Sequence, residues 1–187
     1  VGIAPIYPQV KWLYERGVKA DVIVGAKTKS LLVYEKELSE ISNLYVTTDD
    51  GTSEYKGLVT DMLQRLVDAG KEYDEVVAIG PIIMMKFVSQ LSLKLGIKCT
   101  VSLNSIMVDG TGMCGACRVS IGGETKFTCV DGPEFDGALV DFDNVMKRQA
   151  MYNNVEGHKI LEREEKAENH KCHVGGIVEE MRDNKKR

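Results

Sequence analysis

The chain has 187 residues, of which 43% are hydrophobic, and this is enough to bury the core of one domain with a small appendage. A net charge of -4 without a basic patch argues against nucleic-acid binding. No apolar run approaches the roughly 18 residues that a membrane span needs. Three of the five cysteines fall in one short region, which does not resemble a secreted disulfide framework and predicts a cytoplasmic protein.

Short apolar runs alternate with segments of helical periodicity over the first hundred residues. Strands are predicted at 22–24, 44–47, 76–79 and 99–103, and helices at 5–16, 31–41, 58–69 and 82–91. This alternation is typical of an α/β protein with a parallel, doubly wound sheet. Such sheets bind ligands at the carboxyl ends of their strands, so the turns at 2–5, 25–28, 49–51 and 80–84 are the candidate binding segments.

After Leu103 the pattern changes to short β segments at 118–121 and 125–128, with many glycines between them. This part carries four candidate ligands in the order D-x4-C-x2-C-x11-C, namely Asp109, Cys114, Cys117 and Cys129. Ferredoxin-like [2Fe-2S] loops use C-x4-C-x2-C and a distant fourth cysteine, and here a carboxylate stands in the first place. Glycines suit a loop whose backbone amides must approach cluster sulfurs. A zinc site and unliganded cysteines in a turn are the alternatives.

A helix is predicted from about Val140, and beyond Asn153 the sequence is a run of mixed charges that we expect to be solvated. The tail holds a second candidate metal group, listed here in chain order: His158, His170, Cys172 and His173. Ligands crowded on such a segment lack a rigid surrounding shell, so we favour a solvated tail over a metal site.

Four segments together resemble a known group of flavoproteins. They are Gly2-Ile3-Ala4-Pro5, Thr48-Asp49-Asp50-Gly51, Gly80-Pro81-Ile82-Ile83-Met84-Met85-Lys86 and the stretch 107–143. The group comprises the small, electron-transfer subunits of NADH-dependent ferredoxin:NADP oxidoreductase and sulfide dehydrogenase, with the dihydroorotate dehydrogenase electron transfer subunit as a cousin. The resemblance covers roughly residues 1–152, and the cysteine loop is its most specific part.

This resemblance implies a ferredoxin-reductase-like fold, divided into a pyridine-nucleotide-binding domain (1–103), a small [2Fe-2S] β subdomain (104–139) and a C-terminal helix with a charged tail (140–187). It implies an FAD-binding barrel upstream, which is absent here, so that FAD would bind mostly outside these residues. The first residue is Val1, and Gly2 to Pro5 read as a loop entering a helix. We therefore expect a fragment that lacks the central strand of the sheet and is inactive alone.

The site residues implied by the resemblance fall into two groups. The iron ligands are Asp109, Cys114, Cys117 and Cys129, because the ferredoxin:NADP and sulfide dehydrogenase branch uses one aspartate and three cysteines, whereas the dihydroorotate branch uses four cysteines. The nucleotide-binding residues are Gly2, Ile3, Ala4, Pro5, Gly25, Ala26, Lys27, Thr28, Asp49, Asp50, Gly51, Gly80, Pro81 and Met84. The resemblance favours NAD(H) over NADP(H), although Lys27 is suited to a 2′-phosphate.

The implied function is electron transfer between NAD(P)H, FAD and a [2Fe-2S] cluster, onward to a larger flavin and iron–sulfur subunit in a heterodimer. A nicotinamide delivers two electrons as hydride and a cluster accepts one, so a flavin must stand between them, and no residue here need act as an acid or base. Two alternatives remain: a dihydroorotate dehydrogenase electron transfer subunit, and a zinc-stabilised interaction module.

Overall fold

The computed structural model describes residues 2–151, and all its elements except the end of the last helix lie in one compact unit. The tail beyond residue 151, with its four candidate ligands, lies outside the described residues. The α/β class with parallel strands is confirmed. None of the described helices is long and apolar enough to cross a membrane.

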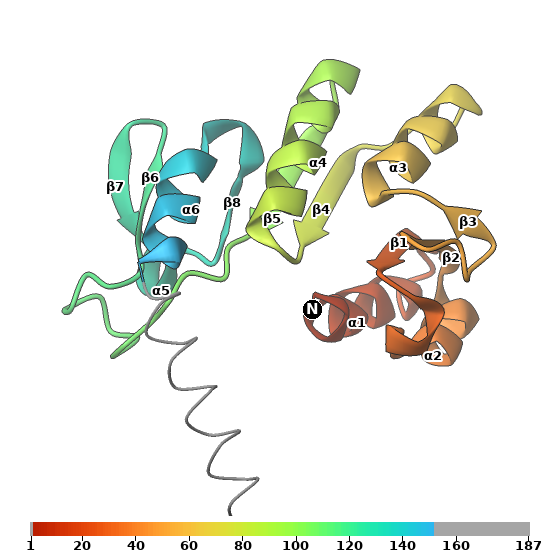
Figure 1. The fold of residues 1–187 in the computed structure, drawn as a ribbon, viewed down its shortest axis with the longest axis horizontal. Helices are drawn as coiled ribbons and strands as arrows, with labels where there is room; N and C mark the ends of the chain where they lie inside the picture. Colours follow the sequence, from red (N-terminus) through yellow and green to blue (C-terminus); the bar gives the residue numbers. More distant parts are fainter. Residues whose placement is uncertain (1, 152–187) are drawn as a thin grey trace, which may run out of the picture. The chain divides into compact units, whose positions relative to one another are not determined.

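The first part of the chain forms a three-stranded parallel sheet with two helices on one face (Figure 1). Its elements, in chain order, are α1 (Ile3–Tyr14), β1 (Asp21–Ala26), α2 (Glu35–Ile41), β2 (Asn43–Thr48) and β3 (Tyr55–Lys56). Val22 of β1 packs with Val10 of α1 and Leu38 of α2, while the next residue, Ile23, turns to the opposite face. This alternation is the two-residue period of a strand.

Sequence periodicity was wrong about the start of the second helix. The chain instead forms a short 3-10 turn, Lys29–Leu31, and the helix begins only at Glu35. Tyr34 interrupts the helical pattern because its φ of 59° is left-handed, and its ring stacks on Tyr7 with 5.3 Å between the centroids. Contact with α1 therefore outweighs the local helical preference of this segment.

The second part has its own three-stranded sheet, in the order β4-β5-β8. After α3 (Val59–Asp68), β4 (Glu75–Ile79) leads through α4 (Ile82–Leu95) to β5 (Lys98–Ser102), which is parallel to β4. β8 (Glu134–Asp136), which was not predicted, pairs antiparallel with β5. Among the described residues, β1 and β4 are edge strands of two separate sheets, and no hydrogen bonds join them.

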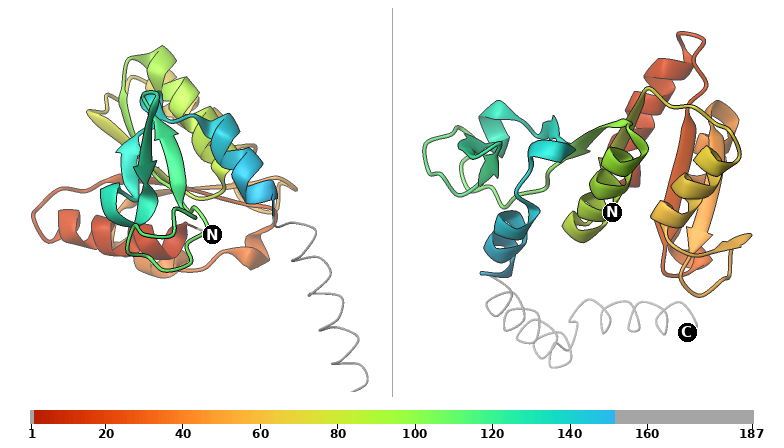
Figure 2. Two further views of the ribbon diagram at one scale, coloured as in Figure 1. Left: turned by 90° about the vertical axis from the view of Figure 1, so that its left-hand side faces the viewer. Right: turned by 90° about the horizontal axis from the view of Figure 1, so that it is seen from above.

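The cysteine-bearing segment folds beside the second sheet, as two further views show (Figure 2). The hairpin of β6 (Arg118–Ile121) and β7 (Glu124–Phe127) is followed by the single turn α5 (Thr128–Asp131). Gly122 and Gly123 form its two-residue turn with positive φ at both positions. A short 3-10 turn (Gly137–Leu139) and α6 (Phe142–Ala150) then return to the core, where Phe142 and Val145 are buried.

Candidate functional site

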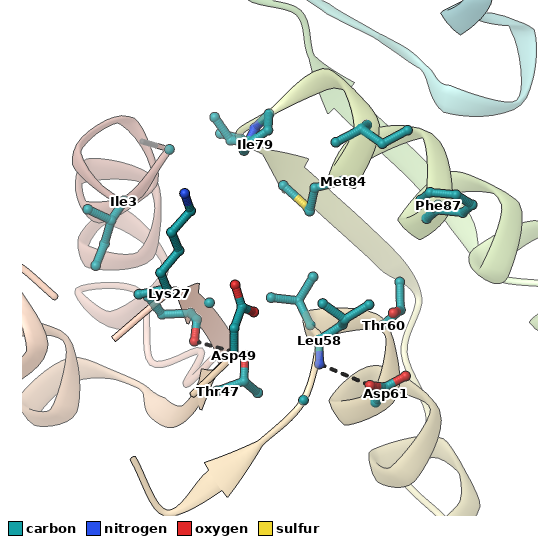
Figure 3. Close-up of a pocket in the computed structure, with 18 of the residues that line it drawn as sticks. Ile3, Lys27, Thr47, Asp49, Leu58, Thr60, Asp61, Ile79, Met84 and Phe87 are labelled. Carbon is teal, nitrogen blue, oxygen red and sulfur yellow. Dashed lines mark hydrogen bonds between the residues drawn. The ribbon is translucent and has the colours of Figure 1, made fainter. Parts of the chain in front are cut away.

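A cavity of about 1080 Å³ lies where the carboxyl ends of β1, β2 and β4 meet the first turns of α1, α3 and α4 (Figure 3). Ligand pockets of small molecules usually span about 300–1000 Å³, so this space is large. Its polar groups include Lys27 and Asp49, and no ion pair is found for either among the described residues. Lys27 and Asp49 therefore make one part of the cavity charged, while the walls from α3 and α4 mix apolar residues with polar and charged ones such as Asp61 and Lys94.

The predicted nucleotide-binding residues divide into those that line this cavity and those that do not. The lining members are Gly2, Ile3, Gly25, Ala26, Lys27, Asp49, Pro81 and Met84. Ala4 and Pro5 are exposed on α1, and Thr28, Asp50, Gly51 and Gly80 are not part of the lining. The structure therefore brings eight of the fourteen to one cavity.

Two glycines beside this cavity, Gly25 and Gly80, lie where a side chain would meet a neighbouring side chain. A Cβ built on Gly25 would lie 2.7 Å from Val59 Cγ1, and one on Gly80 would lie 2.6 Å from Met84 Cε. Both distances are shorter than carbon contacts permit. The glycines noted in the sequence thus allow the backbone of β1 and the end of β4 to lie close to α3 and α4.

Two hydrogen-bonded turns flank the cavity, and they account for Asp50, a predicted residue that does not line it. Asp50 Oδ1 accepts from Thr52 N (3.0 Å) and Thr52 Oγ1 (2.7 Å), and Lys29 N donates to Thr52 Oγ1 (2.8 Å). The Thr52 hydrogen bonds hold the pKa of Asp50 below its ordinary value. Asp50 therefore ties the turn after β2 to the turn after β1, a role that the sequence pattern did not reveal.

The structure brings two of the four candidate cluster ligands together. Cys117 Sγ and Cys129 Sγ lie 3.3 Å apart. The hydrogen bond with the Cys117 thiol is the main cause that raises the pKa of Cys129, and burial is the second. Cys114 is exposed, and its sulfur accepts a hydrogen bond from Ala116 N (3.5 Å). Within residues 2–151, no set of three or more His, Cys, Asp or Glu side chains is close enough to hold one metal ion.

Asp109 closes the cysteine loop onto itself. Its Oδ1 accepts from Thr111 N and its Oδ2 from Cys114 N, both at 3.0 Å. The hydrogen bond from the Thr111 amide is the main reason why the pKa of Asp109 lies below its ordinary value. The carboxylate is thus ionised and fixed to the residue that carries the first cysteine sulfur. Gly110, Gly112 and Gly115, all with positive φ, supply the turns.

Thr128 supports the paired cysteines, and the sequence analysis did not predict it as a residue of the site. It is fully buried; its Oγ1 donates to the carbonyl of Cys117 (3.0 Å) and is hydrogen bonded to Ser105 Oγ (3.0 Å). Its amide also donates to Cys117 O (3.2 Å). Because Cys129 follows directly, these hydrogen bonds hold the backbone of the two cysteines close together. A threonine adjacent to a candidate ligand was the available signal.

The chemistry of these four side chains fits an iron–sulfur cluster. Three cysteines offer soft sulfur ligands once deprotonated, and Asp109 offers a hard carboxylate oxygen. All four lie on one glycine-rich loop and the turn packed against it. Residues 104–141 match the family model described as the iron-sulfur cluster binding domain of dihydroorotate dehydrogenase B. This range begins just after β5 and ends just before α6.

Known proteins match over a longer range. An uncharacterised protein encoded in the adh 3′ region of Clostridium beijerinckii is 62% identical over 88% of this chain and 56% of its own length. A Thermotoga maritima homologue of the dihydroorotate dehydrogenase B (NAD(+)) electron transfer subunit is 49% identical over 83% of this chain and 55% of its own length. The chain thus spans about half the length of the curated relatives it matches.

A solved structure agrees with these relatives. A chain from the NADH-dependent reduced ferredoxin-NADP oxidoreductase, studied for flavin-based electron bifurcation, superposes with a TM-score of 0.77 at 46% identity, covering 86% of this chain and 59% of that one. The chain is similar to these proteins over the matched parts. The resemblance seen in the sequence is therefore confirmed, and so is the ferredoxin-reductase-like fold that it implied.

Proposed function

We propose that this chain supplies the nucleotide-binding and cluster-carrying parts of an electron-transfer subunit in a flavin-dependent oxidoreductase. Residues 1–103 would bind the pyridine nucleotide, 104–139 would hold a [2Fe-2S] cluster, and 140–187 would form a helix and tail. The observation that supports the proposal is the 46% identical solved structure, which superposes with a TM-score of 0.77 over 86% of the chain.

The nucleotide would enter the part of the cavity that Lys27 and Asp49 line. The backbone near Gly25 and Gly80 allows close approach, the first turn of α1 offers free amides toward a pyrophosphate, and Asp49 offers a carboxylate to ribose hydroxyls. A carboxylate accepts hydrogen bonds from two hydroxyls but repels a phosphate, so Asp49 favours NAD(H) over NADP(H). Lys27, on the neighbouring strand end, is the residue that would favour the phosphate.

The cluster would be held by Asp109, Cys114, Cys117 and Cys129. A bound [2Fe-2S] cluster supplies one-electron transfer. The chain's own contribution is to fix Cys117 and Cys129 through Thr128 and to position Cys114 through the Asp109 carboxylate. FAD would bind mostly outside these residues, and a larger flavin and iron–sulfur subunit would receive or donate the electrons. We place the protein in the cytoplasm, because free thiols in a cluster loop require a reducing compartment.

Reconstitution with iron and sulfide tests the cluster proposal. We expect a brown protein whose visible spectrum is that of a [2Fe-2S] centre, a labile cluster in Asp109→Ala, and a retained cluster with a shifted spectrum in Asp109→Cys. An unchanged spectrum in both variants would remove Asp109 from the ligand set. A colourless protein containing zinc would instead support a zinc-stabilised interaction module, the alternative from a different class of function.

Calorimetric titration tests the nucleotide site. We expect NADH to bind more tightly than NADPH, and Asp49→Ala to weaken NADH binding by about tenfold, or about 1.4 kcal/mol. Asp74→Ala is the matched control, because Asp74 is exposed just before β4, at the opposite end of that strand. Equal loss in both variants would contradict a role for Asp49 in binding.

The dihydroorotate dehydrogenase electron transfer subunit is the second candidate, since several relatives carry that name. By resemblance, the dihydroorotate branch uses four cysteine ligands, whereas in this sequence Asp109 occupies the first of the four ligand positions. We therefore favour the ferredoxin:NADP oxidoreductase and sulfide dehydrogenase branch. Dihydroorotate-dependent reduction of the assembled complex would reverse this preference.

A further inference from the structure

Two charged side chains of the cavity come from adjacent turns. Lys27 follows β1 directly and Asp49 follows β2 directly, and these strands pair in parallel over six residues. Figure 3 shows both side chains extending into the same part of the cavity. A lysine attracts a phosphate, whereas a carboxylate repels it and accepts hydrogen bonds from hydroxyls. The relative position of the two turns therefore decides which of these groups the site accepts.

The first contacts between the two turns are made by the backbone. Asp49 N donates to Ala26 O (3.1 Å), and Asp50 N donates to Lys27 O (3.3 Å). The second distance lies beyond the usual 2.7–3.2 Å for such bonds, so the backbone pairing weakens as the chain leaves the strands. Beyond this point, side-chain hydrogen bonds centred on Thr52 join the turns.

The hydroxyl of Thr52 lies at the centre of this contact. It donates to Asp50 Oδ1 (2.7 Å), accepts from Lys29 N (2.8 Å) and lies 3.3 Å from Thr28 Oγ1. A hydroxyl has one hydrogen and two lone pairs, and an ionised carboxylate can only accept, so Thr28 is the donor in the last pair. All the hydrogen-bonding capacity of the Thr52 hydroxyl is therefore used to join 28–29 to the turn after β2.

Thr52 can lose its hydroxyl without loss of the surrounding fold. Its side chain is exposed, and substitutions at exposed positions usually change stability little. The next residue is held separately, because Ser53 N donates to Thr48 Oγ1 (3.0 Å) and Ser53 Oγ is hydrogen bonded to Tyr55 O (3.0 Å). Removal of the hydroxyl should thus release one turn from the other and leave the pairing of β1 with β2 intact.

We propose that the Thr52 hydroxyl is a positioning group that sets the preference of this site for NADH over NADPH, by holding together the turns that carry Lys27 and Asp49. Thr52 is not part of the cavity lining, so it acts through these two residues. When the turns separate, Asp49 loses its fixed position toward ribose hydroxyls, and its repulsion of a phosphate weakens with distance. This inference rests on the proposed function, because it requires that the cavity bind a pyridine nucleotide.

Two substitutions at one position test this. Thr52→Val keeps the shape of the side chain without the hydroxyl, and Thr52→Ser keeps the hydroxyl. In calorimetric titrations we expect Thr52→Val to weaken NADH binding about tenfold and to change NADPH binding by less than about twofold. The preference for NADH therefore falls by about fivefold or more. Thr52→Ser should restore the parent's preference.

Thr125→Val is the matched control. Thr125 is exposed on β7, outside the cavity lining, and the substitution removes the same hydroxyl from the surface. We expect both nucleotides to bind this variant as they bind the parent. Circular dichroism of all the variants checks that each is folded.

Amide exchange provides a readout that needs no nucleotide. Because the Lys29 amide donates to Thr52 Oγ1, nuclear magnetic resonance should show its exchange about tenfold faster in Thr52→Val, and as slow as in the parent in Thr52→Ser. Faster exchange together with a smaller preference for NADH supports the positioning role.

The possible failures are distinguishable. A parent that binds neither nucleotide would refute the proposed function, and this inference with it. A parent that binds NADH, with the same preference in Thr52→Val, would overturn only the role of Thr52, and so would an equal loss of affinity for both nucleotides. A changed preference with unchanged exchange of the Lys29 amide would show that Thr52 contacts the nucleotide directly, which also overturns a positioning role.

Discussion

At the residue scale, a polar cluster around Asp21 holds the crossover to the second sheet against the first. Asp21 Oδ2 accepts from Tyr73 Oη (2.7 Å) and from the Lys71 ammonium, its Oδ1 accepts from Asn43 Nδ2 (2.7 Å), and Lys71 also donates to Tyr45 Oη (2.8 Å). Burial raises the pKa of Asp21, but the hydrogen bonds from Lys71, Asn43 and Tyr73 outweigh it and the net pKa is lowered.

We expect Asp21→Asn to lower the free energy of unfolding at pH 7 by about 1–2 kcal/mol, a value reduced because Lys71 is 38% exposed. Because the folded pKa of Asp21 is depressed, its stabilisation is present above the unfolded pKa of about 3.9 and is lost as pH falls through the folded value. Urea titrations at pH 7 and pH 3 measure this. The difference between the parent and the variant should shrink at pH 3, and a constant difference would contradict the assignment.

At the element scale, α4 belongs both to the core of the second sheet and to the lining of the cavity. One face packs on β5 through Met85 and Val88, both buried, and another lines the cavity through Ile83, Met84 and Phe87. Its sequence is apolar nearly all around, which by itself predicts a helix buried on several sides. On the cavity side of this helix, Ile83 and Phe87 are 49% and 52% exposed among the described residues.

Met85→Ala should cost about 2–5 kcal/mol of stability, because Met85 has no exposed surface and its removal leaves a cavity in the main core. Leu93→Ala is the control on the same helix, since Leu93 is 67% exposed and should cost less than about 1 kcal/mol. Chemical denaturation followed by circular dichroism compares the two. Similar losses would show that the helix does not pack as described.

Sequence periodicity located most elements at this scale but not those set by distant contacts. The strands at 22–24, 76–79 and 118–121 were found within one or two residues, because an apolar run bounded by turn residues is a local signal. β8 and the late start of α2 were not found. β8 exists because Val101 of β5 pairs with Phe135, and α2 begins late because Tyr34 stacks on Tyr7.

At the scale of the whole molecule, the second sheet, α4 and α6 share one core. Phe142 and Val145 of α6 belong to the same buried cluster as Met85 and Val101, and the Lys86 ammonium of α4 contacts Asp143 Oδ1 of α6 at 2.7 Å. The cysteine loop itself lies outside this core, with Met113 88% exposed. We therefore expect loss of the proposed iron–sulfur cluster to loosen the cysteine loop and not the hydrophobic core.

We expect removal of iron from the reconstituted protein by a chelator to speed amide exchange in residues 107–131 while leaving β1 and β2 unchanged. The physical reason is that the loop is held by few hydrogen bonds of its own, chiefly those of Asp109 and Thr128, whereas β1 and β2 pair over six residues. Exchange mass spectrometry before and after chelation measures this. Uniform loosening of the whole chain would contradict it.

The sequence by itself determined the alternation of strands and helices, the order of the four candidate cluster ligands and the glycines near the cavity, because each depends on spacing within a short segment. Only the tertiary structure decided that Thr128 hydrogen bonds to Cys117, that Asp109 caps its own loop, that Asp50 ties two turns together, and that the carboxyl ends of β1 and β4 line a common cavity. These features join residues through the fold rather than along the chain, and local spacing contains no information about which distant backbone or side chain will meet them.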